Sequence, residues 1–334
     1  MGQLITYTPK QISEITNPRP GETKLGECLQ VLSSLDDLTA ATKFVLLGLP
    51  EDIGVRANLG TGGAHTAWET SLRALLTIQS TDRLTGHEVS LLGYLDLTPE
   101  MTLADLYDLK TAEGLKYIRN LVSSIDEQVY DLIRQIVQAG KIPIVVGGGH
   151  NNSYPILKSL AKHHIQGVHT INIDAHADFR ALEGRHSGNG FSYAMHEGYL
   201  AKYALIGLHE NYNSQLILAR LKEHPEQVFY TFFEDYLRRT RSYHKDFEQA
   251  LHFTAGICGL EIDMDCIAGA LASAGSLTGF STNQVREMIA QTKGYKLAYF
   301  HIAEGALTLT DGRTNSLTGK LIATLISDFL KAQS

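Results

Sequence analysis

Three short segments of the sequence place acidic and imidazole side chains directly after apolar runs. The segments are Gly147-Gly148-Gly149-His150, Asp174-Ala175-His176-Ala177-Asp178 and Asp263-Met264-Asp265. Carboxylate oxygens and imidazole nitrogens bind divalent metal ions, and such ions activate water for hydrolysis. These segments are therefore the first candidates for a chemical site.

Alternation along the second segment gives the most specific signal. In an extended chain, residues i, i+2 and i+4 point to one face, so Asp174, His176 and Asp178 converge. Asp263 and Asp265 repeat this spacing with two carboxylates. Without a cation, so many acids on one face would repel and raise each other's pKa values. Four carboxylates and two imidazoles exceed the needs of one ion, which predicts a two-metal site. Oxygen-rich ligation with some imidazole favours Mn²⁺, with Zn²⁺, Ni²⁺, Co²⁺ and Fe²⁺ left open.

Each segment taken alone also has a plain structural explanation. The Asp-x-His-x-Asp segment can be a solvated strand end, and His150 can be a hydrogen-bonded core histidine. Asp263 and Asp265 can be the start of a loop. Because all three segments follow apolar strands, and ligands bind beyond the carboxyl ends of parallel strands, a shared metal site is favoured.

Apolar runs alternate with helical patterns along most of the chain, which predicts a mostly parallel sheet with helices on both faces. The expected strands are residues 43–49, 89–95, 142–146, 168–173, 203–207, 228–232, 257–262 and 297–301. The expected helices are residues 113–139, 153–164, 283–291 and 316–332. In the longest helix, apolar residues recur at three- and four-residue steps, and Gly140 is placed for a left-handed cap.

Composition excludes several classes of function. The 334 residues include 29 Lys+Arg and 36 Asp+Glu, a formal net charge of −7. This balance argues against a partner that is nucleic acid or an anionic membrane. No apolar run reaches the roughly 18 residues of a membrane span. Three sparse cysteines are typical of a reducing compartment, so we expect a cytoplasmic protein.

The three metal motifs together resemble the signatures of the ureohydrolase family, which contains arginases, agmatinases and formimidoylglutamases. The likeness covers residues 43–332 and includes the loop Gly48-Leu49-Pro50-Glu51-Asp52-Ile53-Gly54-Val55-Arg56. It implies a single arginase-like three-layer α/β/α domain, with a mostly parallel sheet of about eight strands. We assign residues 41–334 to this catalytic domain and residues 1–40 to an N-terminal arm. The resemblance also implies a homo-oligomer.

The resemblance further implies a role for each metal ligand, with two Mn²⁺ per chain. His150 and Asp178 would bind one ion, and His176 and Asp265 would bind the other. Asp174 and Asp263 would bridge the two ions. All six positions are occupied by residues that can bind metal. The sequence departs from the family just beyond them, because Ala268-Gly269 replaces the usual Asp-Pro pair. We expect this change to affect the loop that follows.

Within the family, four features resemble formimidoylglutamases. The motif Gly147-Gly148-Gly149-His150 lacks the aspartate that arginases and agmatinases usually have before the histidine. Arg180 matches the Asp-x-Arg ending of the formimidoylglutamases. Gly190-Phe191 follows Ser187-Gly188-Asn189, where arginases have a catalytic histidine. The segment 317–322 also resembles the last-helix entry of some members. In contrast, Ser187-Gly188-Asn189 is close to the turn of the arginases.

The resemblance also suggests how a substrate would be bound. The Arg180 guanidinium is suited to a carboxylate, whereas it would repel a cationic side chain. Alternatively, Arg180 does not bind substrate and serves only to neutralise the charge of the acidic cluster. Asn189, with Ser187, would contact a substrate carboxylate. Glu304 matches the family glutamate that receives the cationic nitrogen end of the substrate, unless it is an exposed loop acid.

Two residues are candidates for moving protons. Asp178, although a metal ligand, is placed by analogy with the family to protonate the departing amine. His186 is a candidate acid or base in place of the missing histidine, although loop histidines are more often structural. With Glu304, these two residues make up the predicted catalytic set.

The predicted activity is hydrolysis of the C–N bond of a linear amidine by metal-activated water. The favoured substrate is N-formimidoyl-L-glutamate, which would give L-glutamate and formamide in histidine breakdown. The first alternative is a urea-releasing hydrolase of a guanidino compound. The second is a metal-dependent binding protein without catalytic activity.

Overall fold

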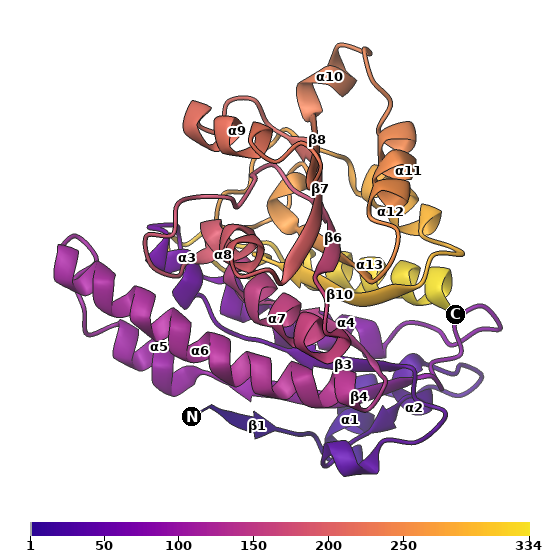
Figure 1. The fold of residues 1–334 in the computed structure, drawn as a ribbon. Coiled ribbons are helices and arrows are strands. Elements are labelled where there is room, and N and C mark those ends of the chain that lie inside the picture. Colours follow the sequence, from indigo (N-terminus) through magenta and orange to yellow (C-terminus); the bar gives the residue numbers. More distant parts are fainter. Residues whose placement is uncertain (1) are drawn as a thin grey trace.

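One sheet of ten strands positions all three metal segments within the described residues, 2–334. The structure is a computed structural model (Figure 1). The strands are β1 (Gln3–Ile5), β2 (Gln30–Val31), β3 (Phe44–Gly48), β4 (Val89–Asp96), β5 (Ile142–Val146), β6 (Val168–Ile173), β7 (Leu200–Leu208), β8 (Val228–Phe232), β9 (Cys258–Asp263) and β10 (Leu297–Ala303). All eight predicted strands are present, and β1 and β2 are additional. The predicted fold class is therefore confirmed.

The order of the strands explains why distant segments meet. The sheet runs β1-β4-β3-β5-β10-β9-β6-β7-β8, and β2 pairs with β4 beside this path. All pairs are parallel except β1 with β4. The consecutive strands β5, β10, β9 and β6 lie at the centre, and their carboxyl ends share one edge. The metal segments follow β5, β6 and β9.

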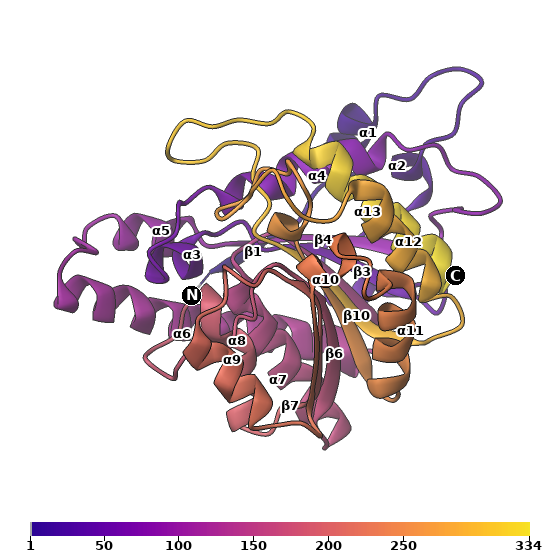
Figure 2. The same cartoon turned by 90° about the horizontal axis from the view of Figure 1, so that it is seen from above.

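Helices cover both faces of the sheet, as Figure 2 shows for α6, α7 and α8 on one side and α11, α12 and α13 on the other. The α-helices are α1 (Pro9–Thr16), α2 (Leu25–Cys28), α3 (Ile53–Ala57), α4 (Ala67–Leu76), α5 (Thr98–Ala104), α6 (Ala112–Gln138), α7 (Ser153–His164), α8 (Gly190–His196), α9 (Gln215–Lys222), α10 (Phe233–Leu237), α11 (Tyr243–Phe253), α12 (Thr282–Gln291) and α13 (Thr318–Gln333). Alternate residues of each strand enter two separate cores. In β3, Phe44 and Leu46 pack on the α4 and α13 side, whereas Val45 and Leu47 pack on the α6 side.

The longest helix, α6, closely matches its sequence prediction of residues 113–139. The Thr111 side chain accepts a hydrogen bond from the Gly114 backbone N–H at 3.0 Å and so caps the helix. Ile118, Val122 and Ile125 form part of its buried stripe. Gly140 follows the helix with φ of +71°, as its position predicted.

The N-terminal residues pack against the sheet edge. Strand β1 pairs antiparallel with β4, and β2 pairs parallel with the same strand. Ile12 and Leu25 enter the same core as Trp68 of α4. The boundary at residue 40 stays a prediction.

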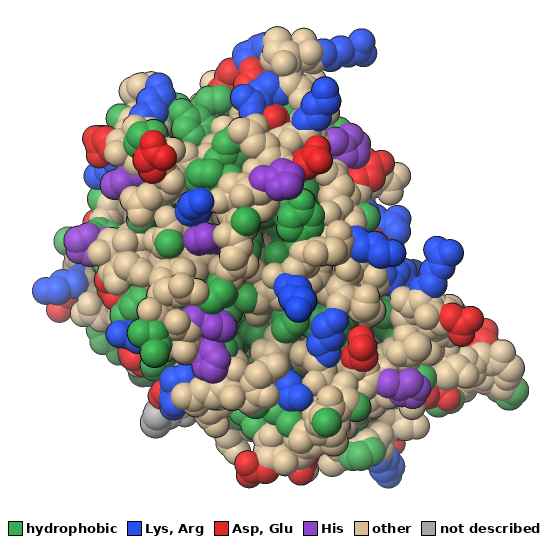
Figure 3. Space-filling model, turned by 45° about the vertical axis from the view of Figure 1, so that its right-hand side comes forward, with side chains coloured by type: hydrophobic (Ala, Val, Ile, Leu, Met, Phe, Trp, Pro, Cys, Tyr) green, Lys and Arg blue, Asp and Glu red, His purple; other side chains and the backbone are tan. Residues whose placement is uncertain are grey.

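The visible surface mixes both signs of charge. On the face shown in Figure 3, Lys and Arg side chains are interspersed with Asp, Glu and His. None of the helices among residues 2–334 combines the length and apolar character needed to cross a membrane.

Candidate metal centre and substrate cavity

The loop after β5 places His150 at the centre of the sheet edge. Gly147 and Gly148 have φ of +88° and +74°, a region that favours glycine. A Cβ on Gly148 would lie 2.2 Å from the Asn152 side-chain nitrogen. A Cβ on Gly149 would lie 2.5 Å from the Asn151 side-chain oxygen. The triple glycine therefore lets the chain turn tightly enough to point His150 into the site.

Three carboxylates surround one ring nitrogen of His150. Its Nδ1 lies 3.0 Å from Asp178 Oδ2, 3.2 Å from Asp263 Oδ2 and 3.3 Å from Asp174 Oδ2. The His150 side chain is fully buried. We call these four residues group one.

A second group adjoins the first through Asp174. His176 Nδ1 lies 2.8 Å from Asp265 Oδ2 and 3.8 Å from the other oxygen of Asp174, Oδ1. We call Asp174, His176 and Asp265 group two. The two oxygens of Asp174 therefore face different groups, which supports the predicted bridging role. Asp263 Oδ2 faces His150 of group one, and its Oδ1 accepts a hydrogen bond from the backbone N–H of Asp265 at 2.9 Å.

The electrostatics of the two groups favour a bound cation. Burial and the neighbouring Asp265 raise the pKa of Asp263 well above its usual range. Burial, with Asp265 and Asp178 nearby, raises the pKa of Asp174 to about 6. Positive charge between these carboxylates would relieve the repulsion.

Unpartnered polar atoms point to the same conclusion. Both ring nitrogens of His150, and Asp265 Oδ1, are buried without a hydrogen-bond partner, which is costly unless another ligand occupies them. In each group the donor atoms lie within 4.8 Å of one another. Mixed carboxylate and imidazole donors suit Mn²⁺. The six predicted ligands thus lie together and fit two such ions.

A cavity of about 460 Å³ opens above the two groups. His176, Asp178, Asp263, Asp265 and Glu304 line one part of it. Arg180, Ser187 and Arg220 also line it. A charged small molecule could therefore contact the metal groups and the arginines within one cavity.

Glu304 lies directly after β10, with φ of +65°. Its Oε1 accepts a hydrogen bond from the His150 backbone N–H at 3.0 Å. Burial, together with the charge of Asp178, raises the pKa of Glu304 to about 8. A cationic group in the cavity would favour the charged form of this carboxylate.

Arg180 lies at the cavity with its side chain 44% exposed. One of its guanidinium nitrogens donates to Asn58 Oδ1 at 2.9 Å, and another donates to Glu183 Oε1 at 2.9 Å. Ser187 lines the same wall, 3.4 Å from the Asn58 side-chain nitrogen. Both predicted residues are therefore placed where a substrate could reach them.

Asn189 lies in the same loop but uses its side chain within the protein. Its Oδ1 accepts hydrogen bonds from the Arg185 guanidinium at 2.7 Å and from the His186 backbone N–H at 3.0 Å. Its Nδ2 donates to the carbonyls of Ala181 and Gly184. Asn189 is absent from the described cavity wall. Its observed contacts fix the loop that presents Arg180.

His186 is fully buried and also lies behind the cavity wall. Its Nδ1 accepts a hydrogen bond from the Gly188 backbone N–H at 3.1 Å, and its Nε2 lies 3.3 Å from Glu183 Oε1. Burial, with Arg119 and Arg180 nearby, lowers the pKa of His186 to about 3. The imidazole is therefore neutral near pH 7 and has little tendency to donate a proton as an acid.

The loop after Asp265 differs from the family pattern for a visible reason. Gly269 has φ of +77°, and its N–H donates to the Ser276 carbonyl at 2.8 Å. A proline at 269 could neither adopt this φ nor donate this hydrogen bond. Ser273 and Ala274 of this loop line the cavity, so the replacement affects its shape.

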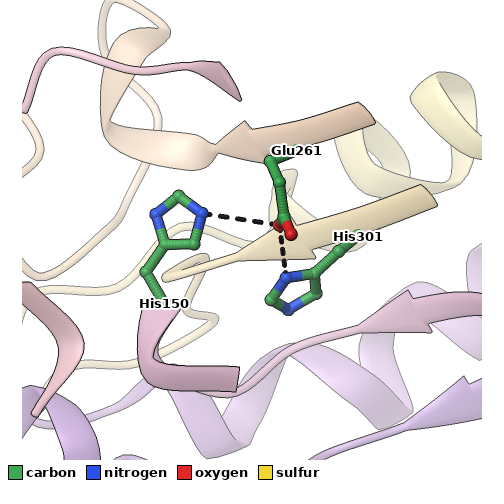
Figure 4. Close-up of side chains that lie close together, drawn as sticks. All are labelled: His150, Glu261 and His301. Atoms are coloured by element: carbon green, nitrogen blue, oxygen red, sulfur yellow. Dashed lines mark hydrogen bonds and ion pairs between the residues drawn. The ribbon is translucent and has the colours of Figure 1, made fainter. Parts of the chain in front are cut away.

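The sequence analysis missed a buried pair beneath His150. Glu261 of β9 and His301 of β10 lie side by side, with His301 Nδ1 2.6 Å from Glu261 Oε2 (Figure 4). The same Oε2 lies 3.4 Å from His150 Nε2. Although burial would raise it, the charge of His301 lowers the pKa of Glu261 to about 2. The sequence did carry a signal for this pair, because Glu261 and His301 are ionisable residues within strands that are otherwise apolar.

Two further residues were missed. Glu51 is fully buried, and its Oε1 accepts hydrogen bonds from the Gly149 backbone N–H at 2.9 Å and from the Asn152 side chain at 2.7 Å. It therefore fixes the loop that bears His150. Arg220 of α9 lines the cavity, and none of the described residues forms an ion pair or hydrogen bond with its guanidinium. A lone arginine in an amphipathic helix gave no distinguishing signal.

The fold and the site together define an α/β protein with a candidate binuclear metal centre at the ends of its central strands. The sequence model of the Arginase family matches residues 42–328, so the chain belongs to the arginase family. The family expected from the three motifs is thereby confirmed.

Individual relatives agree with this assignment. A formimidoylglutamase of Macrococcus caseolyticus is 28% identical over 302 residues, covering 89% of this chain and 88% of that protein. The formiminoglutamase of Trypanosoma cruzi, crystallised with Mn²⁺, superposes with a TM-score of 0.73 at 17% identity, covering 93% of this chain and 98% of that one. The formimidoylglutamase of Bacillus subtilis gives a TM-score of 0.72 at 18% identity, covering 94% and 93%. These superpositions confirm the fold.

Proposed function

We propose that this protein is a binuclear manganese hydrolase that cleaves N-formimidoyl-L-glutamate to L-glutamate and formamide. The observation on which this rests is one cavity lined by members of both metal groups, by Glu304 and by two arginines. The substrate has a cationic nitrogen end and two carboxylates, which match these features in sign. The names of the relatives support the same reaction.

Two Mn²⁺ ions would be bound by groups one and two and would supply Lewis acidity and an activated water. Glu304 is suited to orient the substrate. Its Oε1 is already fixed by the His150 backbone, and its Oε2 has no hydrogen-bond partner among the described residues. A formimidoyl N–H donating to Oε2 would form a charge-assisted contact. The reacting carbon would then be oriented toward the two groups.

The arginines are suited to the glutamate part of the substrate. We assign one carboxylate to Arg180 and the other to Arg220. Arg220 gains most from such a contact, because it has no protein partner within the described chain. A substrate without carboxylates, such as agmatine, would bring a second cationic group toward both guanidiniums.

Bond cleavage requires one proton on the departing nitrogen. The water oxygen forms a new bond to the formimidoyl carbon, and the bond from that carbon to the glutamate nitrogen breaks. Asp178 lines the cavity and is the only predicted catalytic acid or base, other than Glu304, that does so. We assign to Asp178 the transfer of the proton that the attacking water loses to the departing glutamate nitrogen, so that formamide and glutamate leave with all atoms accounted for. His186 is a poorer candidate because its lowered pKa makes it a weak base and because it lies behind the cavity wall.

A product assay tests the proposal directly. Mn²⁺-loaded protein is incubated with N-formimidoyl-L-glutamate, and in parallel with L-arginine, agmatine and guanidino acids. Formamide and glutamate from the first substrate alone are the expected result. Urea from a guanidino compound, without formamide, would establish the first alternative. Bound metal with no product from any substrate would establish a binding protein.

We also retain two proposals about the cellular state. The three cysteines are free thiols, which supports a cytoplasmic location. The expected homo-oligomer is tested by sedimentation velocity.

A further inference from the structure

A row of polar side chains crosses the sheet beneath the metal groups. Asn172, Glu261 and His301 occupy facing register positions on β6, β9 and β10. All three are fully buried. Asn172 donates a hydrogen bond to Asp174 Oδ2 at 2.9 Å, so one member of the row already contacts a metal ligand.

The other two members form an ionic pair that faces His150. His301 Nδ1 lies 2.6 Å from Glu261 Oε2, and His301 Nε2 lies 3.3 Å from the Gly147 carbonyl oxygen. Both ring nitrogens of His301 thus face oxygen atoms, which fixes the orientation of the ring. Gly147 begins the loop that leads to His150. The pair therefore lies against both the ring of His150 and the backbone that bears it.

Such a pair is a poor choice for stability alone. Removing two charges from water is costly, and apolar residues of similar volume are often as stabilising as a buried ion pair. Here both members lie in the interior of central strands, where apolar side chains would pack well. Stability alone therefore does not account for the pair, and its contact with His150 points to a role in the metal site.

We propose that Glu261 and His301 are positioning residues that orient His150 as a metal ligand. Glu261 Oε2 lies 3.4 Å from His150 Nε2 (Figure 4), whereas the three carboxylates lie near the other ring nitrogen, Nδ1. An N–H on Nε2 directed at Glu261 leaves the lone pair of Nδ1 free for metal. His301 fixes Glu261 in this role. The inference concerns metal binding and does not depend on which amidine is the substrate.

The second group provides an internal comparison. His176 has a side chain that is 30% exposed, and its ring stacks on Tyr212 with centroids 5.4 Å apart. None of the described carboxylates pairs with His176 Nε2. Loss of the Glu261 and His301 pair should therefore weaken group one selectively.

The test compares Glu261→Gln, Glu261→Met and the double variant Glu261→Met with His301→Leu. Glutamine keeps an oxygen that can accept from His150 Nε2, whereas methionine does not. The double variant also removes the buried His301 imidazole that Glu261→Met leaves without its carboxylate partner, so its folding should recover. Mn²⁺ titration with electron paramagnetic resonance distinguishes a coupled pair of ions from a single ion. Thermal melting of the metal-free proteins measures stability.

Selective loss of one ion is the expected result. In Glu261→Met, the affinity of one of the two sites for Mn²⁺ should fall by about 10- to 100-fold. In Glu261→Gln, the affinity of the same site should fall less. The double variant should melt closer to the wild type and still bind one ion weakly. Asp246→Asn is the matched control, because Asp246 forms a shielded ion pair with Arg241 away from the metal groups. It should lower the melting temperature and leave both ions bound.

Three results would overturn the proposal. The first is wild-type affinity for both ions in Glu261→Met. The second is equal weakening of both sites in proportion to lost stability. The third is recovery of the second ion in the double variant, which would show that Glu261 and His301 only satisfy each other's hydrogen bonds.

Discussion

Oε1 of Glu304 accepts a hydrogen bond from the backbone N–H of His150 at 3.0 Å, although 154 residues separate them. The contact joins the ends of the neighbouring strands β5 and β10. It fixes the orientation of the carboxylate without using its second oxygen. The Glu304 side chain is therefore placed in relation to the metal groups before any substrate arrives.

The first prediction concerns Glu304→Gln. Glutamine retains an oxygen for the His150 N–H but loses the charge that faces the formimidoyl nitrogen. We expect kcat/KM to fall by about 100- to 1000-fold, the usual effect of losing one aligned electrostatic contact in a catalytic site. Metal analysis should still find two Mn²⁺ per chain. Activity within threefold of the wild type would remove Glu304 from the mechanism.

The second prediction concerns Asp174→Ala. Because its two oxygens face different groups, this change should weaken both metal sites and abolish turnover together. Isothermal titration with Mn²⁺ provides the measurement. Asp105→Ala is a control, since Asp105 is an exposed acid that pairs with Arg56. Two intact sites in Asp174→Ala would contradict the bridging assignment.

The third prediction concerns substrate binding by the two arginines that line the cavity, Arg180 and Arg220. Arg180→Ala and Arg220→Ala should each raise KM for the dicarboxylate by about 10- to 100-fold, consistent with about 1.5–3 kcal/mol for a hydrogen bond to a charged group. Metal content should not change. Arg238→Ala, at an exposed pair with Glu210, should leave KM unaltered. An unchanged KM in Arg220→Ala would show that Arg220 does not contact the substrate.

The fourth prediction tests whether Asn189 is structural. Removal of its amide in Asn189→Ala takes one hydrogen bond from the buried Arg185 guanidinium, which keeps its contacts with Asp126, and leaves two carbonyls without this donor. We expect the free energy of unfolding to fall by about 1–3 kcal/mol, as measured by urea titration. KM should rise less than in Arg180→Ala. The opposite ranking, with stability unchanged, would restore Asn189 as a direct substrate ligand.

The fifth prediction concerns pH. His65 Nδ1 lies 2.9 Å from Asp52 Oδ2, and the same oxygen accepts from the Gly63 backbone N–H. The hydrogen bond with Asp52 raises the pKa of His65, and despite burial the contact with His65 lowers the pKa of Asp52. The contribution of His65 is complete below about pH 6.5, its unfolded value, and disappears as pH rises through the folded pKa. The contribution of Asp52 is complete above about pH 4 and disappears as pH falls through its folded pKa.

The pair should therefore stabilise the fold most between about pH 4 and 6.5. The difference in unfolding free energy between the wild type and His65→Gln should be largest near pH 5.5 and should shrink above pH 7. Urea denaturation across this range provides the measurement. A difference that grows with rising pH would contradict the assigned direction.

The sequence by itself determined eight of the strands, the longest helix and the segments that bear the predicted ligands. Near-continuous apolar runs predicted eight strands, because strands buried by helices on both faces need apolar side chains in both directions. The alternation of Asp174, His176 and Asp178 predicted convergence, because an extended chain points alternate residues to one side. Both inferences depend on local geometry, which neighbouring residues encode.

Only the tertiary structure decided which distant groups touch. The strand order β5-β10-β9-β6 brings Glu304 to His150 and His301 to Glu261, and no local pattern encodes that order. The same limit applies to Asn189, whose four contacts come from the folding of its own loop. Long-range pairing depends on how whole faces pack, so the supporting residues of the site emerged only when the sheet was assembled.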